Sequence, residues 1–403
     1  MKPKKIKDGV FWVGAVDWDR RLFDSLIPLP YGTSYNAYLV VGSEKTALLD
    51  TVEPSKTEVL LSQLEEVESI DYIVSHHAEQ DHSGAIPAVL DRYPEAVVLA
   101  STKARALLMD HLRIPEARVR TVADGEKVSL GGKTFEFIYA PWVHWPETMF
   151  TYLAEDRVLF TCDLFGSHLA ASGVFYEDGW KVREEAKRYY SEVMMPFRSI
   201  IARHMDRISG LDMDVIAPSH GPAHGSTGMI LEAHREWVSE KVKNKVVVPF
   251  ASMHGSTEKM VDVLTEELSQ RGVVVERFNM AVSDMGELAM SLVDAATIVI
   301  GSPTVLLGAH PLVVSAVFMA NSLKPKLKFA SIIGSYGWGG RMVEQITGLM
   351  GNLKVEMIEP VMIKGKPTED DFAAIAGLAG KIAARHEKSE DVLTGGPVEG
   401  AGV

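Results

Sequence analysis

Short apolar runs separated by polar turns dominate the first part of the chain. Runs with the length and composition of β-strands cover residues 10–13, 38–41, 46–50, 72–74, 97–100, 128–130, 134–139, 158–160 and 215–217. Between them, apolar residues that recur every three or four positions predict helices at 58–66, 84–92 and 103–112, and a long helical stretch at about 181–208. This mixture of hairpin-like strands and helices predicts an α/β domain.

The pattern changes after a charged segment at residues 240–245 (Glu-Lys-Val-Lys-Asn-Lys). Beyond it, strand-like runs at 246–250, 296–301 and 329–334 alternate with helical stretches such as 257–271 and 368–387. Such alternation is typical of a doubly wound parallel sheet. We therefore predict two domains, residues 1–244 and 245–388. The remaining tail, 389–403, is rich in glycine and short of large apolar residues, so we expect it to be flexible.

Composition narrows the class of protein. With 403 residues, 46% of them hydrophobic, the chain can bury two full cores. No apolar run approaches the ~20 residues needed to span a bilayer, and the basic start lacks the apolar stretch of a signal peptide. The single cysteine, Cys162, excludes a disulfide framework and a cysteine-rich iron–sulfur module, and it fits a reducing cytoplasm. A net charge of −13 argues against a nucleic-acid partner.

Candidate metal ligands gather where one buried strand ends. Residues 76–82 read His-His-Ala-Glu-Gln-Asp-His and follow the apolar run at 72–74 directly. On an extended segment His77 and Glu79 point to the same side, because side chains alternate. Asp81 and His82 lie past the strand end and can face a second metal. Five ligand-type residues in seven positions are more than a helix cap needs, so a metal site is a better interpretation than a polar turn.

Three later strand-like runs each end in another ligand type, namely His144, Asp163 and His220. Any one of them alone would more often be a core or capping residue. Together with the first segment they form a set of imidazoles and carboxylates that fits two iron ions. We predict that His77, Glu79 and His144 bind one ion, that Asp81, His82 and His220 bind the other, and that Asp163 bridges them.

Three loops of the second half consist mostly of small and hydroxylated residues and follow strand ends. They contain Ser252, Met253, His254, Gly255, Ser256 and Thr257; Ser302, Pro303, Thr304 and Val305; and Ser335, Tyr336, Gly337, Trp338, Gly339 and Gly340. The first precedes a helix and can bind phosphate through backbone N–H groups, although it is neither a Walker A loop nor a dinucleotide fingerprint. In a doubly wound sheet these loops meet at one edge, where Tyr336 and Trp338 offer ring surface to a flat ligand. We prefer FMN over the alternative that these aromatic residues only pack the loop onto the core.

The His-x-Glu-x-Asp-His pattern at 77–82 resembles the metallo-β-lactamase signature His-x-His-x-Asp-His, with Glu79 in place of the second histidine. Combined with a flavodoxin-like second half, the chain resembles flavodiiron proteins (A-type flavoproteins) nearly end to end. The resemblance implies an N-terminal metallo-β-lactamase-like αββα sandwich and a C-terminal flavodoxin-like sheet. It also implies a non-haem diiron centre, FMN, and reduction of dioxygen to water or nitric oxide to nitrous oxide in anaerobic cells.

The same resemblance implies partners and neighbouring groups. One subunit's FMN would serve the partner's irons in a head-to-tail homodimer, alone or as a dimer of dimers. The electron donor would be rubredoxin, an NADH-linked reductase or a reduced deazaflavin. His168 or Tyr190 would supply hydrogen bonds or protons beside the irons. His254 stands where the family commonly has tyrosine, and it would bring a pH-dependent positive charge near the FMN phosphate.

Two other functions fit parts of the sequence. A metal-dependent hydrolase would use a metal-bound hydroxide and carry the second half passively. Glu79 argues against it, because an oxygen ligand in place of imidazole shifts a mixed site from zinc towards iron or manganese. A flavodoxin-like electron carrier would leave the seven predicted ligands without a use. The sequence leaves the choice between dioxygen and nitric oxide open.

Overall fold

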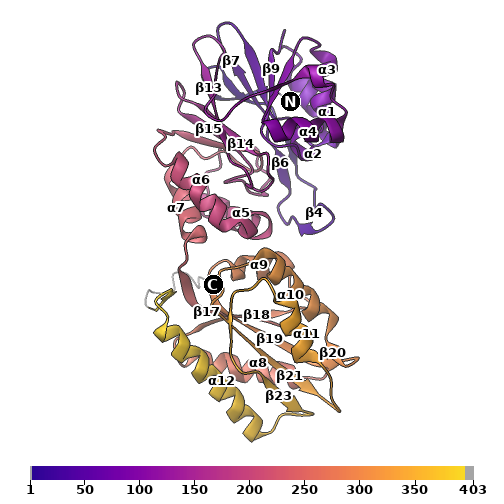
Figure 1. Cartoon of the computed structure of the whole chain (residues 1–403), viewed down its shortest axis with the longest axis vertical. Coiled ribbons are helices and arrows are strands. Elements are labelled where there is room, and N and C mark those ends of the chain that lie inside the picture. The colour runs from indigo at the N-terminus through magenta and orange to yellow at the C-terminus, as the bar shows by residue number, and fades with distance from the viewer. Residues whose placement is uncertain (1, 395–403) are drawn as a thin grey trace. The chain divides into compact units, whose positions relative to one another are not determined.

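The computed structural model describes residues 2–394 and divides into two compact units, Met1–Val238 and Ser239–Val403 (Figure 1). The division comes before the predicted boundary at residue 244, because the first strand of the second unit, β17 (Val242–Phe250), begins inside the charged segment. None of the helices in the described part of the chain is long and apolar enough to cross a membrane.

Two sheets lie against each other in the N-terminal unit, in the orders β1-β2-β7-β8-β9-β10-β11 and β12-β13-β14-β15-β16. Their strands are β1 (Lys4–Lys7), β2 (Val10–Trp12), β7 (Tyr38–Val41), β8 (Thr46–Leu49), β9 (Tyr72–Ser75), β10 (Val97–Ala100), β11 (Val119–Thr121), β12 (Lys127–Ser129), β13 (Thr134–Tyr139), β14 (Met149–Leu153), β15 (Val158–Cys162) and β16 (Val215–Pro218). Two short hairpins accompany them, β3 (Ala15–Asp17) with β6 (Thr33–Tyr35) and β4 (Leu22–Phe23) with β5 (Ile27–Pro28).

Alternation along the central strands explains the layers. Leu49 and Val74 pack between the two sheets with Phe137 of the second sheet. Their sequence neighbours Leu48 and Ile73 point the other way, into a core shared with α1 (Thr57–Gln63), α3 (Ile86–Arg92) and α4 (Thr102–Leu112). On the side of the second sheet lie α5 (Gly179–Tyr189), α6 (Arg198–Ile208) and α7 (Thr227–Val238) (Figure 1). The predicted αββα sandwich is thus confirmed.

The long helical stretch predicted at 181–208 is wrong as one element. α5 ends at Tyr189, a π-helical turn covers Tyr190–Met194, and a 3₁₀ turn covers Met195–Phe197 before α6 begins. Pro196 lies in that 3₁₀ turn. Proline has no backbone N–H and its ring clashes with the preceding helical turn, so one continuous α-helix cannot pass through this residue.

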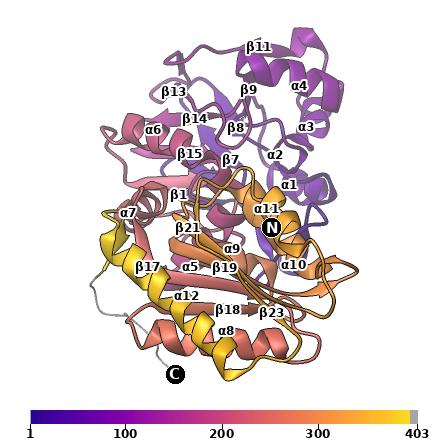
Figure 2. The same ribbon diagram turned by 60° about the horizontal axis from the view of Figure 1, so that its bottom comes forward.

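The second unit is a parallel sheet with the strand order β18-β17-β19-β21 and then β23, which is the flavodoxin-like arrangement predicted. Its strands are β17, β18 (Val274–Asn279), β19 (Ala295–Val305), β21 (Phe329–Tyr336) and β23 (Val361–Lys364), with the short β20 (Gly308–Ala309) and β22 (Glu356–Met357) at β19 and β21. α8 (Ser256–Ser269) and α12 (Glu369–Lys388) cover one face, and α9 (Met285–Leu292), α10 (Pro311–Leu323) and α11 (Met342–Leu349) cover the other (Figure 2).

Part of the tail that we expected to be flexible is ordered. Val392 and Leu393 form β24, which pairs parallel to the start of β17. The side chain of Val392 is buried against Val242 and Ala296, and this contact offsets the entropy lost in ordering the segment. The rest of the predicted tail, 395–403, lies outside the described residues.

Candidate functional site

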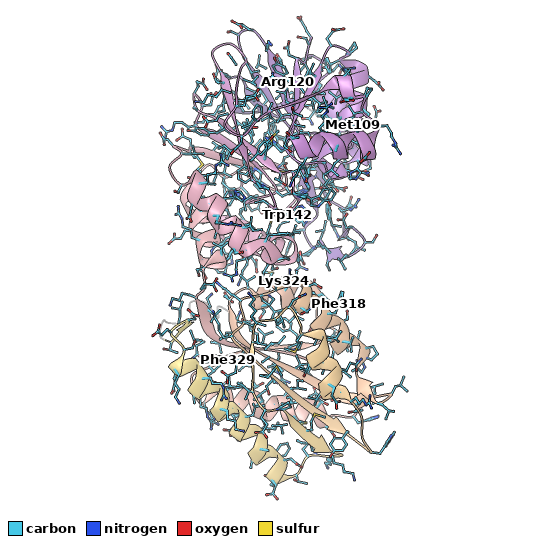
Figure 3. The ribbon with its side chains drawn as sticks, viewed as in Figure 1. Met109, Arg120, Trp142, Phe318, Lys324 and Phe329 are labelled. Carbon is cyan, nitrogen blue, oxygen red and sulfur yellow. The ribbon has the colours of Figure 1, made fainter. Side chains whose placement is uncertain are left out.

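The seven predicted metal ligands meet at one end of the two sheets in the N-terminal unit. His77 and Glu79 follow β9, and Asp81 and His82 lie in the short helix α2 (Gln80–Ser83). The loop after β13 carries His144, and the ends of β15 and β16 carry Asp163 and His220. Figure 3 labels Trp142, two residues before His144 in that loop. The strand ends therefore bring together residues far apart in sequence.

One group of ligand atoms comes from His77, Glu79, His144 and Asp163, all within 4.8 Å of one another. Glu79 Oε2 lies 3.0 Å from His77 Nε2 and 3.3 Å from His144 Nε2. Asp163 Oδ2 closes the group at 3.2 Å from His144 Nε2. Two imidazole nitrogens and two carboxylate oxygens thus converge on one point.

A second group comes from Asp81, His82 and His220, again within 4.8 Å. Asp81 Oδ2 lies 3.0 Å from His220 Nε2 and 3.3 Å from His82 Nε2. This group also meets Asp163, because Asp163 Oδ1 lies 3.0 Å from His82 Nε2. The sequence assigned the same three residues to the second ion.

Asp163 lies between the two groups and is fully buried. Its Oδ2 atom faces His144 and its Oδ1 atom faces His82, so each oxygen belongs to a different group. A carboxylate with this orientation can bridge two ions. The geometry therefore supports the predicted role of Asp163.

The electrostatics of the two groups fit metal ions. Asp163 Oδ1, both oxygens of Asp81 and both ring nitrogens of His82 are buried. The short contacts among them lack hydrogen-bond geometry, and these atoms have no hydrogen-bond partner among the described residues. Burial alone would lower the pKa of His144, but Asp163 and Glu79 raise it to about 10. Burial would likewise raise the pKa of Asp163, yet the His82 and His144 imidazoles hold it well below its usual range. The buried carboxylates are therefore stabilised by nearby positive charge, which two iron ions would supply.

A buried carboxylate, not predicted from the sequence, lies behind the first ligand. Glu147 Oε1 accepts a hydrogen bond from His77 Nδ1 at 2.7 Å and another from the backbone N–H of Ala78 at 3.0 Å. Burial would raise the pKa of Glu147, but the bond to His77 lowers it. The signal in the sequence was the position of Glu147, three residues after His144 in the same loop.

His76, the residue before the first ligand, faces away from the ligand groups. Its Nδ1 donates to Asp50 Oδ2 at 2.7 Å, and the Thr151 hydroxyl lies 2.7 Å from its Nε2. Asp50 also accepts the backbone N–H of His76. These bonds fix the end of β9 from which the ligand segment starts.

A cavity of about 280 Å³ opens beside the ligands. Besides ligand residues, its wall contains Phe23, Asp24, Ile27, Trp145, Tyr189, Glu192 and Val193. Of the two groups predicted beside the irons, His168 is close, with its ring centroid 5.0 Å from that of His220 and its Nδ1 2.9 Å from the Thr33 hydroxyl. Tyr190 is placed elsewhere, against His234 and Trp237. One helical residue is about 100° of rotation, so its neighbour Tyr189 faces the cavity instead.

Loops of the second unit enclose a separate cavity of about 720 Å³. It is lined by Ser252, Met253, His254, Ser256, Thr257, Pro303, Thr304, Val305, Leu306, Leu307, Ser335, Tyr336, Gly337, Trp338, Gly339 and Gly365. Three predicted contacts, Gly255, Ser302 and Gly340, are not among the lining residues. Instead they shape the loops: Gly255 has φ +80°, Ser302 Oγ accepts the His310 N–H, and a Cβ at Gly340 would meet Thr304 at 2.7 Å. Three lining residues were not predicted: Leu306 and Leu307, which follow β19, and Gly365, which follows β23.

One end of this cavity is suited to a phosphate. The N-terminus of α8 opens there, with Ser256 and Thr257 in its first turn, and helix N-termini attract anions. Ser252 Oγ accepts the N–H groups of Gly255 and Glu258 and holds the loop in this shape. Among the described residues that line the cavity, His254 is the only one with a basic side chain.

Comparison with known proteins agrees with both sites. Residues 33–221 match the family model described as ODP family beta lactamase, and residues 248–376 match the flavodoxin model. A nitric oxide reductase of Moorella thermoacetica is 38% identical over 395 residues, which cover 95% of this chain and 99% of that protein. The chain belongs to the flavodiiron protein family.

Solved structures of flavodiiron proteins share the whole fold. Rubredoxin oxygen:oxidoreductase from Desulfovibrio gigas superposes with a TM-score of 0.91 at 30% identity, covering 95% of this chain and 98% of that one. The flavodiiron protein from Giardia intestinalis gives a TM-score of 0.88 at 25% identity, covering 96% and 97%. The cofactors of a flavodiiron protein are FMN and a non-haem diiron centre, and the two groups of ligands and the loop cavity fit them.

Proposed function

We propose that this flavodiiron protein reduces dioxygen to water, nitric oxide to nitrous oxide, or both. When bound, FMN supplies electrons and the diiron centre supplies the place where the gas is reduced. The observation that carries the proposal is Asp163, whose two oxygens face two separate groups of imidazole and carboxylate ligands. The names of two similar proteins, a nitric oxide reductase and a rubredoxin oxygen oxidoreductase, support both substrates.

The residues around the ligands have their own tasks in this proposal. His77, Glu79 and His144 would hold one iron, Asp81, His82 and His220 the other, and Asp163 would bridge them. The cavity beside the ligands is small and partly apolar, with Phe23, Ile27 and Val193 in its wall, and it fits a diatomic gas. Tyr189 is the neutral phenol in that wall, since burial holds its pKa well above the usual value, and its hydroxyl is suited to donate a hydrogen bond to the gas.

The FMN contacts follow from the second cavity. The N–H groups and hydroxyls of Ser256 and Thr257 would hold the phosphate, and Tyr336 and Trp338 would lie beside the ring system. His254 would lie beside the bound FMN. Trp338 is 91% exposed, so its ring is available to a flat ligand.

We further propose a cytoplasmic homodimer that receives electrons from a separate donor. The two cofactor sites belong to different units, and a two-fold dimer lets each FMN serve the partner's irons through one self-complementary surface. Rubredoxin is the donor named in the Desulfovibrio gigas protein, and a reduced deazaflavin or an NADH-linked reductase are the alternatives. The single, buried Cys162 supports a reducing compartment.

Metal and flavin analysis separates this function from its rivals. We expect about two irons and one FMN per chain, as the two ligand groups and the single loop cavity imply. Iron should leave on chelation while FMN stays bound, because the sites share no residue. Zinc in both positions together with hydrolysis of phosphoesters or thioesters would contradict the redox function, and FMN without metal would favour an electron carrier.

A further inference from the structure

We infer that Glu147 is a positioning residue that makes the two iron sites unequal. Its carboxylate would hold the imidazole of His77 to the first iron, whereas the imidazole of His220 at the second iron is held only by a neutral carbonyl. The inference rests on the proposed diiron function and goes beyond it. It stands on the contacts of one buried carboxylate, which neither the ligand pattern nor the family comparison assigns.

The two ring nitrogens of His77 face different carboxylates. Its Nε2 atom faces Glu79 and its Nδ1 atom lies 2.7 Å from Glu147 Oε1. A neutral imidazole has one N–H and one lone pair, so a carboxylate behind Nδ1 fixes the N–H there. The lone pair of Nε2 is then directed at the first ligand group. A carboxylate in this position also raises the electron-donating strength of the imidazole.

Glu147 is held in place by burial and by hydrogen bonds. Its side chain is fully buried, and the Oε1 atom that contacts His77 also accepts the Ala78 N–H. Its backbone carbonyl accepts the Ser101 hydroxyl at 2.8 Å. One carboxylate oxygen therefore accepts hydrogen bonds from both the His77 ring and the peptide that follows it. These two bonds restrain the rotation of the ring and the position of the His77 backbone.

The two groups of ligands differ in what lies behind their imidazoles. His144 is three residues before Glu147, so a single loop supplies one imidazole of the first group and orients the other. On the second side, His220 Nδ1 donates to the backbone carbonyl of Ser34 at 2.8 Å, which is a neutral acceptor. The negative charge behind an imidazole is thus placed at His77 and not at His220.

The test uses Glu147→Gln in the full-length holoprotein. Glutamine keeps the size and an acceptor oxygen for the His77 ring and the Ala78 N–H, but it removes the charge. We expect the first iron to bind about ten- to a hundredfold more weakly, the loss typical of such partners. In a titration with a chelator, the variant should fall to about one iron per chain where wild type still holds about two. FMN content should not change.

Mössbauer spectra of protein enriched in the iron-57 isotope give a readout that a loss of stability alone would not move. At the intermediate chelator concentration, wild type should show the signals of two iron sites and Glu147→Gln the signal of one. Glu147→Asp keeps the charge on a shorter side chain and should recover part of the lost affinity. The matched control is Ser101→Ala, which removes the hydrogen bond to the Glu147 backbone. It should lower the melting temperature and leave the chelator titration as in wild type.

Two results would overturn the inference alone, provided that wild type binds two irons. In the first, Glu147→Gln retains both irons as wild type does. In the second, Glu147→Gln loses both irons as its melting temperature falls, and Ser101→Ala does the same, as expected if the loop is only structural. A wild-type chain that takes up no iron would instead refute the proposed function, and this inference with it.

Discussion

Replacing Asp163 with asparagine should empty both iron sites and leave FMN in place. Asp163 presents one carboxylate oxygen to each group of ligands, and its charge faces the His82 and His144 imidazoles in a fully buried site. An amide of the same size keeps one oxygen acceptor, but it has no charge and presents an NH₂ group to one of the two sites. Removing a residue that only hydrogen-bonds to a metal ligand typically weakens metal binding by about ten- to a hundredfold. Asp163 would itself be a ligand, so we expect each iron to bind at least about a hundredfold more weakly.

Iron should be measured chemically and FMN by absorbance after release from the same sample. The control is Asp212→Asn, which removes an exposed carboxylate paired with Arg157 in the same unit. It should keep both cofactors. An Asp163→Asn variant with full iron and full activity would show that Asp163 is only a structural residue at the end of β15.

Two inactive variants should restore each other's activity when their subunits exchange. Ser256→Asp places a carboxylate against the phosphate at the N-terminus of α8 and should prevent FMN binding while iron is kept. Asp163→Asn has the opposite defect. If each FMN serves the partner's irons, a mixed dimer contains one complete pair of sites. After random exchange of equal amounts, about half of the dimers are mixed, and each has one of its two pairs intact. The mixture should then regain up to about a quarter of wild-type activity, by pairing symmetry.

The measurement needs subunit exchange under mild conditions, followed by gas consumption with a chemical reductant. Each variant exchanged with itself is the control and should stay inactive. Monomers that turn over at the full rate after dilution would contradict the dimer. So would a mixture that exchanges subunits and never recovers.

The candidate iron ligands could be predicted because several of them come directly after segments with the hydrophobic pattern of a strand. His77, His144 and Asp163 each come after a short apolar run, and strand ends meet at one edge of a sheet. The loops of the FMN cavity could be predicted for the same reason, since β17, β19 and β21 lie side by side. The order of the elements thus already determined which residues can meet.

Contacts that depend on side-chain direction could not be read in this way. Glu147 was missed because its partner His77 is 70 residues away, and no period connects the two positions. Tyr190 was predicted beside the irons and Tyr189 was not considered, because the helical phase near the break at Pro196 does not follow from the pattern. The tail was expected to be flexible because it is rich in glycine and short of large apolar residues, whereas Val392 is buried and β24 pairs with β17.

The most direct test of the proposed function is to mix the fully reduced holoprotein with dioxygen and, separately, with nitric oxide in an anaerobic stopped-flow instrument. FMN absorbance reports the reoxidation, and the products are measured after mixing. The proposal predicts reoxidation much faster than that of free reduced FMN, with water as the product of dioxygen or nitrous oxide as the product of nitric oxide. A reduced protein that neither gas reoxidises faster than free FMN, or that releases hydrogen peroxide from dioxygen and no nitrous oxide, would contradict it.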